Sequence, residues 1–443
     1  MKKSILFSIF LFATIVVNAQ AKKWTLQECV QHALENNISV KQSELDVAST
    51  EIEKLDAIGN FLPSLNLSGS VSQNTGLGFD PTTGNPANVT FLSASGGANI
   101  GYTLFDGLRN VRGLQRAKLS KLASQYRLDK MKDDISLFVA NGYLQVLLNK
   151  ANLEVIQSQN AVTLEQITRT NELVDAGVIP RGDLLEIQAT DASEKQRIAV
   201  AENAVTISKI SLAQLLLIKD FENFDVIDEG YEVVDSGIML KPVSEVISTA
   251  QENRSEVKIA EQNVALAEKD LQLSRGAYYP TLSAFFGYDT RYSDNDALGR
   301  NLTEQLWQND GVGYGLSLNV PVLNGLSARN NVKRSKIGVE RTKYQLEQAK
   351  LDLESSIYQA YVDAKGALKA YEAAESALES QNLAYQYAKD RYDVGRTNAF
   401  DFSQSKLRYD NARIEVNRSK YDYIFKTKVL ELYFGVPASE LKF

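Results

Sequence analysis

The chain repeats itself once, with an offset of about 217 residues. Residues 37–63 match residues 254–280 at an offset of 217, and the later segments match at 218. Gly177 corresponds in this way to Gly395, and Asp183 corresponds to Asp401. Because the offset survives helix, strand and turn signals, we infer one structural unit duplicated in tandem. The period is far too long for a solenoid, so each copy must contain several secondary-structure elements.

The repeat predicts how the chain is divided. Each copy contains a short helix, a strand pair and a long helical hairpin, and the two copies have the same order of elements. The first copy covers 37–219, with strands in 64–105 and a hairpin tip at 176–183. The second copy covers 254–432, with strands in 281–323 and a hairpin tip at 393–401.

The first residues predict export. Lys2-Lys3 is followed by an apolar run from Ile5 to Val17 and by a small-residue cleavage site ending at Ala19. This pattern is typical of a signal peptide over residues 1–19. The apolar run is well short of the roughly 20 residues that a spanning helix needs.

Composition argues against most catalytic and metal-dependent functions. The chain has one cysteine, Cys29, and one histidine, His32, and both lie in an amphipathic segment where a structural role is expected. The chain therefore has too few cysteine and histidine residues for a disulfide framework, a metal site, or a Ser/His or Cys/His catalytic pair. The net charge of −7, which becomes −9 without Lys2 and Lys3, argues against a nucleic-acid partner. We expect no enzyme activity, no cofactor and no metal.

Long helices dominate each copy. The stretches 110–176 and 330–393 contain no proline, and the second carries a seven-residue repeat of large residues alternating with alanine. This spacing is typical of a coiled-coil seam. Helices of about 65 residues would be about 100 Å long. The heptad residues are Ile357, Ala364, Tyr371, Leu378, Tyr385 and Tyr392.

Each long helix ends at a glycine and the chain then reverses. Gly177 and Gly395 are C-cap signals. Asp183 with Glu186, and Asp401 with Gln404, predict capping boxes at the start of return helices over 183–217 and 401–432. Shorter helices are expected at 39–58 and 255–273.

Between the helices, apolar and polar residues alternate. Leu65, Leu67 and Val71 share one face in the first copy, and Leu316 and Leu318 share one in the second. The pattern predicts four strands of about ten residues, joined within each pair by polar loops at 73–89 and 293–310. This length suits a tilted crossing of an outer membrane, and soluble hairpins at the end of a helix bundle are the alternative. Four strands cannot close a membrane barrel, so several chains would have to pool theirs.

Several of these segments carry a family resemblance in their order along the chain. The segments are Trp24–Cys29, Ala33–Asn37, Phe61–Pro63, Leu104–Gly107 and the tip Arg391–Gly395, with Asp401 six residues after the tip glycine. In this order and duplicated, they resemble the TolC family of outer-membrane efflux ducts over essentially all of the chain after the signal peptide.

The resemblance implies a fold, a location and partners. The fold would be an α+β membrane protein, a homotrimer with a twelve-stranded β-barrel in the outer-membrane lipid, continued by a twelve-helix α-barrel in the periplasm. Segments 20–36, 220–253 and 433–443 would form a small mixed equatorial domain. The function would be the channel-tunnel of a tripartite efflux or type I secretion system, with a periplasmic adaptor protein and an inner-membrane pump. A periplasmic coiled-coil scaffold without a channel is the alternative.

The resemblance also implies roles for residues at the hairpin tips. Asp401 would face the pore at its narrowest point, with Gln404 nearby, where the best-known member of the family has a second acid. Asp183 with Tyr392 opposite would latch neighbouring hairpins. The competing interpretation makes Asp401 an N-cap completed by Gln404. The turns that would dock the adaptor contain Gly177, Val178, Gly395 and Arg396.

Overall fold

The computed structural model describes residues 23–80, 83–233, 237–296 and 298–436. The predicted signal peptide and the outer parts of segments 20–36 and 433–443 lie outside these residues. The chain divides into two compact units, and each unit draws on both copies of the repeat. The helical unit is built from residues within 1–44, 127–257 and 349–443, and the sheet unit from residues within 45–126 and 258–348.

The helices confirm the duplication element by element. Equivalent helices have equal lengths: 22 residues for α3 and α7, 67 for α4 and α9, and 35 for α5 and α10. Their ends lie within a few residues of the predicted ones. Among the described residues, no helix combines the length and the apolar character needed to cross a membrane. The helices are α2 (Leu26–Asn36), α3 (Ile38–Gly59), α4 (Arg109–Asp175), α5 (Arg181–Leu215), α6 (Val243–Asn253), α7 (Ser255–Gly276), α8 (Leu302–Gln308), α9 (Ser327–Asp393) and α10 (Ala399–Tyr433), with a 3-10 turn at Ile238–Leu240.

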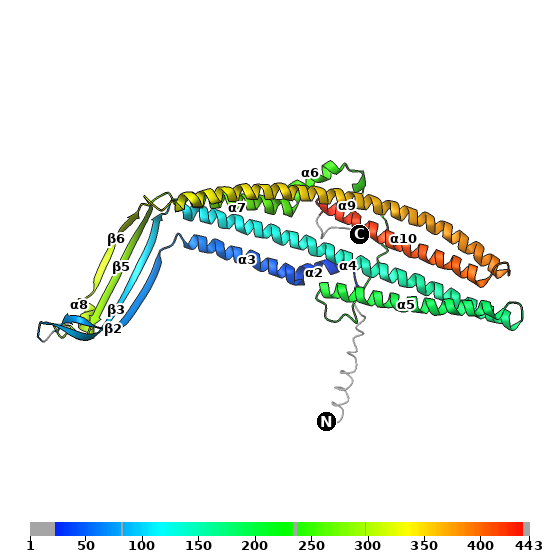
Figure 1. The fold of residues 1–443 in the computed structure, drawn as a ribbon, viewed down its shortest axis with the longest axis horizontal. Coiled ribbons are helices and arrows are strands. Elements are labelled where there is room, and N and C mark those ends of the chain that lie inside the picture. The colour runs from blue at the N-terminus through cyan, green and yellow to red at the C-terminus, as the bar shows by residue number, and fades with distance from the viewer. Residues whose placement is uncertain (1–22, 81–82, 234–236, 297, 437–443) are drawn as a thin grey trace, which may run out of the picture. The chain divides into compact units, whose positions relative to one another are not determined.

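In the helical unit, α5 returns along α4 and α10 returns along α9 (Figure 1). Two of the six predicted heptad residues, Ile357 and Ala364, are fully buried, and the other four are half-buried.

A hydrophobic core of the helical unit lies around the short strands β1 and β4 and includes residues of α2, α4, α5 and α10. Strands β1 (Lys23–Trp24) and β4 (Asp225–Val226) pair in parallel, and the Tyr143 hydroxyl of α4 donates to the Trp24 and Ile227 carbonyl oxygens at 3.1 and 2.6 Å. Cys29 is fully buried there, and the His32 ring packs edge-on against Trp24. Both residues therefore have the structural surroundings that the sequence predicts.

The sheet unit contains, among its described residues, one antiparallel sheet in the order β2-β3-β5-β6 (Figure 1). Leu65, Ile100, Phe286 and Tyr314 lie in one row across the four strands, because each is paired with the next. The predicted apolar residues thus share one face of the sheet. The strands are β2 (Ser64–Phe79), β3 (Pro86–Phe105), β5 (Thr281–Ser293) and β6 (Gly311–Asn319).

The first strand pair is longer than the sequence predicts. The segment 73–89, expected to be a loop, continues both strands with paired residues from Gln73↔Leu92 to Phe79↔Pro86. Polar pairs stabilise this extension: the hydroxyls of Thr75 and Thr90 lie 2.9 Å apart, and Asn74 Nδ2 donates to Ser93 Oγ at 3.1 Å. The prediction was wrong because polar and glycine residues were taken as loop signals, whereas cross-strand hydroxyl pairs also support strands.

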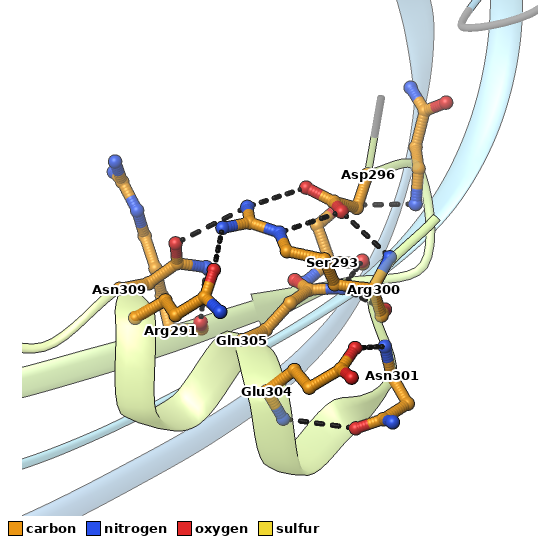
Figure 2. Close-up of polar contacts among 10 residues, drawn as sticks. Arg291, Ser293, Asp296, Arg300, Asn301, Glu304, Gln305 and Asn309 are labelled. Carbon is orange, nitrogen blue, oxygen red and sulfur yellow. Dashed lines mark hydrogen bonds and ion pairs between the residues drawn. The ribbon is translucent and has the colours of Figure 1, made fainter. Parts of the chain in front are cut away.

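The second predicted loop, 293–310, contains the short helix α8 (Figure 2). Asn301 and Glu304 form a capping box, which is the N-x-x-E signal that the interpretation as a loop missed. The Gln305 side chain is 1% exposed and bonds to both the Ser293 backbone N–H and its carbonyl oxygen at 2.8 Å. Just before α8, Arg300 forms an ion pair of 2.8 Å with Asp296. These bonds give the segment a defined conformation.

Candidate functional site at the hairpin tips

Both hairpin tips begin with a complete Schellman motif. Gly177 and Gly395 each have φ of 72°, in the left-handed region that glycine adopts at no steric cost. The Val178 N–H donates to the Leu173 carbonyl at 2.9 Å, and the Arg396 N–H donates to the Arg391 carbonyl at 2.7 Å. The predicted C-caps are confirmed. A Cβ on either glycine would meet no atom within 4 Å, so both turns are open surface.

The predicted N-caps are wrong. Helix α10 starts at Ala399 and its cap is Asn398, whose Oδ1 accepts the Asp401 N–H at 2.8 Å; helix α5 is preceded by Pro180, which makes no side-chain cap bond. Asp183 and Asp401 are therefore the third residues of their helices, because each helix begins two residues earlier than predicted. A carboxylate in the first turn still interacts favourably with the helix dipole.

The Asp401 carboxylate is consequently not needed for capping. It is exposed, and Oδ2 accepts a hydrogen bond from the Thr397 hydroxyl at 3.4 Å, which is long for such a bond. Gln404 lies one turn further along α10 and is also exposed. The competing interpretation, in which Asp401 is the cap and Gln404 completes it, does not hold.

One cleft of about 910 Å³ lies between the two tips. It brings together most of the residues that the sequence singles out, from both copies of the repeat. Gly177 and Gln404 are outside its lining. The predicted residues that line it are Val178, Asp183, Tyr392, Gly395, Arg396 and Asp401.

Contacts between α4 and α9 join the tips within one chain. The Tyr392 and Thr170 hydroxyls lie 3.0 Å apart, and Arg169 forms an ion pair with Asp393 at 2.9 Å. Burial raises the pKa of Tyr392, and the nearby Asp183 charge adds to this. Asp183 thus affects Tyr392 through its charge, while the Tyr392 hydroxyl forms its hydrogen bond with Thr170. Sequence reasoning missed Thr170 and Arg169, since no local pattern marks them and only the packing of α4 against α9 brings them to Tyr392.

A buried charged network joins the hairpins further from the tips. Lys406 on α10 is 2% exposed, and its Nζ donates to Glu194 Oε1 on α5 at 2.5 Å. It also donates to the Gln159 carbonyl and the Thr163 hydroxyl of α4, at 2.9 and 2.5 Å. Asn160 donates to the other Glu194 oxygen at 3.1 Å. One ammonium group therefore fastens the second hairpin to both helices of the first.

Asp410 lies one turn beyond Lys406 and is 3% exposed. Burial raises the pKa of Asp410 to about 6, and Lys406 works against this rise. Sequence reasoning missed the network, although a signal exists. The signal is a spacing of four residues between Phe402, Lys406 and Asp410, which places all three on one face of α10. Because Phe402 marks this face as buried, the two charged residues on it are expected to be buried as well.

Within the described residues, no group of three or more His, Cys, Asp or Glu side chains is placed to hold a metal ion. The tip cleft offers charged side chains, an aromatic ring and two open turns. This arrangement suits a contact surface.

Comparison with known proteins places these features in context. A family model described as "Outer membrane efflux protein" matches residues 29–216 and 246–435. The chain is 23% identical over 417 residues to Outer membrane protein TolC of Vibrio cholerae, covering 93% of this chain and 90% of that protein. It is 24% identical over 380 residues to Protein CyaE of Bordetella pertussis, covering 84% and 75%. The crystal structure of the Campylobacter jejuni CmeC outer membrane channel has a TM-score of 0.79 at 18% identity, covering 93% of this chain and 85% of that one, which shows a common fold.

Proposed function

This chain belongs to the outer membrane efflux protein family, and from that premise we propose that it is the outer-membrane duct of a tripartite efflux or type I secretion system. It is a transport protein of the outer membrane, with its helices in the periplasm, and not an enzyme. The observation that carries the proposal is the sheet, which has one apolar face and leaves both outer strands, β2 and β6, without a neighbour within the described residues. Lipid tolerates no open sheet edge, so the sheet must be completed by other copies.

Three copies would supply twelve strands, enough for a closed barrel. The apolar face would turn to lipid, and the opposite face, where Ser70 and Ser95 hydroxyls lie 2.8 Å apart, would line the lumen. The helical hairpins of the three chains would continue the barrel as a tunnel of twelve helices. Segments 20–36, 220–253 and 433–443 would form the equatorial domain around it.

The hairpin tips would form the periplasmic gate and the docking surface. Threefold symmetry would bring three Asp401 carboxylates around one axis, where they would concentrate cations. Gln404 would add polar but uncharged groups, and Asp183 with Tyr392 would latch adjacent hairpins. The exposed turns, with Val178 66% exposed, suit contact with a periplasmic adaptor that connects the duct to an inner-membrane pump.

The barrel proposal is tested by placing a charge on the apolar face. Leu316→Arg should cost about 2–4 kcal/mol if this 66% exposed residue lies near the bilayer midplane. Ser317→Arg is the matched control, because the next residue of β6 faces the lumen and should be tolerated. The measurement is the yield of heat-modifiable trimer extracted from outer membranes. Normal insertion of the Leu316→Arg protein would contradict the barrel and favour a scaffold without a channel.

The gate proposal is tested with Asp401→Asn. The cap of α10 is Asn398, so the exchange removes a charge and leaves the start of the helix intact. Single-channel recording in planar bilayers should show weaker cation selectivity and less block by divalent cations. Asp175→Asn removes an exposed charge from the end of α4, outside the cleft lining, and should leave both properties unchanged. Unaltered selectivity and block in the Asp401→Asn channel would remove Asp401 from the gate.

A further inference from the structure

Helix α8 has an apolar side that is exposed in the described sheet unit. The Leu302 side chain is 50% exposed and Trp307 is 76% exposed, while Leu306 is half-buried. At about 3.6 residues per turn, these three side chains share one side of the helix, and Glu304 and Gln308 share another. A helix with one apolar and one polar side suits the boundary between water and lipid.

Polar contacts fix the position and the rotation of α8. Gln305 points from the helix toward β5 and bonds to the backbone of Ser293 (Figure 2). The Thr290 hydroxyl of β5 donates to the Leu306 carbonyl oxygen at 2.7 Å. Trp307 comes two residues after Gln305, so it lies on roughly the opposite side of the helix. The indole ring is therefore held on the side that faces away from the strand.

The contact with Thr290 places α8 at one end of the apolar face of the sheet. Side chains on this face of β5 are apolar at first and carry hydroxyl groups further along the strand. They are, in order, Leu282, Ala284, Phe286, Tyr288, Thr290 and Tyr292. Tyrosine is enriched where a membrane barrel meets the lipid headgroups. Helix α8 thus lies at the level where the apolar face becomes amphipathic.

The course of the chain places this end of the sheet outside the cell. Strand β5 begins at Thr281, shortly after the periplasmic helix α7, and α8 follows its far end. Because the Thr290 side chain lies on the apolar face, α8 contacts the side of the sheet that the proposed barrel turns to lipid. The apolar surface of the sheet therefore continues onto the helix.

We propose that α8 is an amphipathic anchor that inserts Trp307 and Leu302 into the outer surface of the bilayer. The partner is the lipid itself, at the boundary between headgroups and acyl chains. An indole suits this boundary, since its apolar ring meets the chains while its N–H meets headgroup oxygens. The inference rests on the proposed barrel and extends its lipid contact from the strands to the segment between β5 and β6.

Trp307 is itself the probe for this contact. The chain has two tryptophans, so Trp24→Phe leaves Trp307 as the only one. The exchange keeps an aromatic ring beside His32 and the backbone carbonyl that accepts the Tyr143 hydroxyl. The full-length variant is reconstituted in phosphatidylcholine vesicles that carry bromine atoms on the acyl chains, near the headgroup or near the chain end. Bromine near the headgroup should cause the larger loss of Trp307 emission, and iodide in the water should cause little.

The matched control moves the ring around the helix. Trp24→Phe combined with Trp307→Phe and Gln308→Trp places the only tryptophan on the polar side of α8. Iodide should quench this variant strongly, and brominated lipid should quench it much less. Channel formation in planar bilayers shows that each variant still forms a duct.

The other outcomes separate the anchor from the duct. Quenching of Trp307 by iodide and by neither lipid would show that α8 lies in water, and shielding from all three would show that protein covers it, as a second copy would. Strongest quenching by bromine at the chain ends would place α8 in the hydrocarbon core. Each of these results would overturn the anchor and leave the duct in place. A wild-type protein that neither inserts into vesicles nor forms channels would instead overturn the proposed function.

Discussion

Replacing Lys406 with Met is expected to destabilise the helical unit by about 3–5 kcal/mol, because it leaves the buried Glu194 carboxylate without its cation. The Gln159 carbonyl and the Thr163 hydroxyl would lose their donor as well. Hydrogen-exchange mass spectrometry should detect the change as amide exchange at least a hundredfold faster in α5 and α10 around these residues. The effect is local, since α4, α5 and α10 meet at this one ammonium group.

A double variant separates the lost charge from the lost packing. Lys406→Met combined with Glu194→Gln removes both charges and leaves a neutral buried amide near Asn160. It should recover most of the protection, since replacing a complete buried ion pair by neutral groups is often close to neutral in stability. Exchange rates in Lys406→Met that match the wild type would show that the network does not hold the hairpins together.

Gly395→Glu is expected to abolish export while the trimer still inserts in the outer membrane. The open turn would carry a new negative charge close to Asp393 and Asp401 on the surface that we propose docks the adaptor. A left-handed conformation costs a residue with a Cβ about 1–2 kcal/mol, which a long packed hairpin can bear. Export of a pump substrate by whole cells is measured beside trimer abundance in the outer membrane.

The control for this variant must match the backbone strain. Gly395→Asn places a side chain in the same turn without a charge, and asparagine tolerates the left-handed region better than most residues. It should keep a substantial share of export. If Gly395→Glu and Gly395→Asn both fail to form trimers, the glycine serves only as a cap and the docking proposal loses its support.

Local chemistry made much of the architecture predictable. Repetition of helix, turn and strand signals at one offset identified equivalent elements, and the helices have equal lengths in both copies. The C-caps at Gly177 and Gly395 were predictable, since the left-handed residue of a Schellman motif is usually glycine. The apolar faces followed from alternation, because the side-chain period of a strand is two.

Other features depended on competition between neighbouring signals. Asp401 and Asn398 both suit an N-cap, and which one caps depends on where the helix starts, so the sequence favoured the wrong residue. The segment 73–89 has loop composition, yet cross-strand partners from the rest of the hairpin extend the strands through it. In both places, residues outside the local pattern decided the conformation.

The sequence by itself determined the duplicated order of elements, the apolar faces and the residues at the hairpin tips, because these depend on short-range periodicity and backbone preference. Only the tertiary structure decided that Lys406 lies between Glu194, Gln159 and Thr163, since these residues come from three helices far apart along the chain. It also decided that Arg116 of α4 forms an ion pair with Asp270 of α7, whereas Arg334 and Glu53, which occupy the corresponding positions of the repeat, stay exposed. The same local sequence pattern is therefore packed against another helix at one place and exposed at the corresponding place, because only the fold decides which segments of the chain meet.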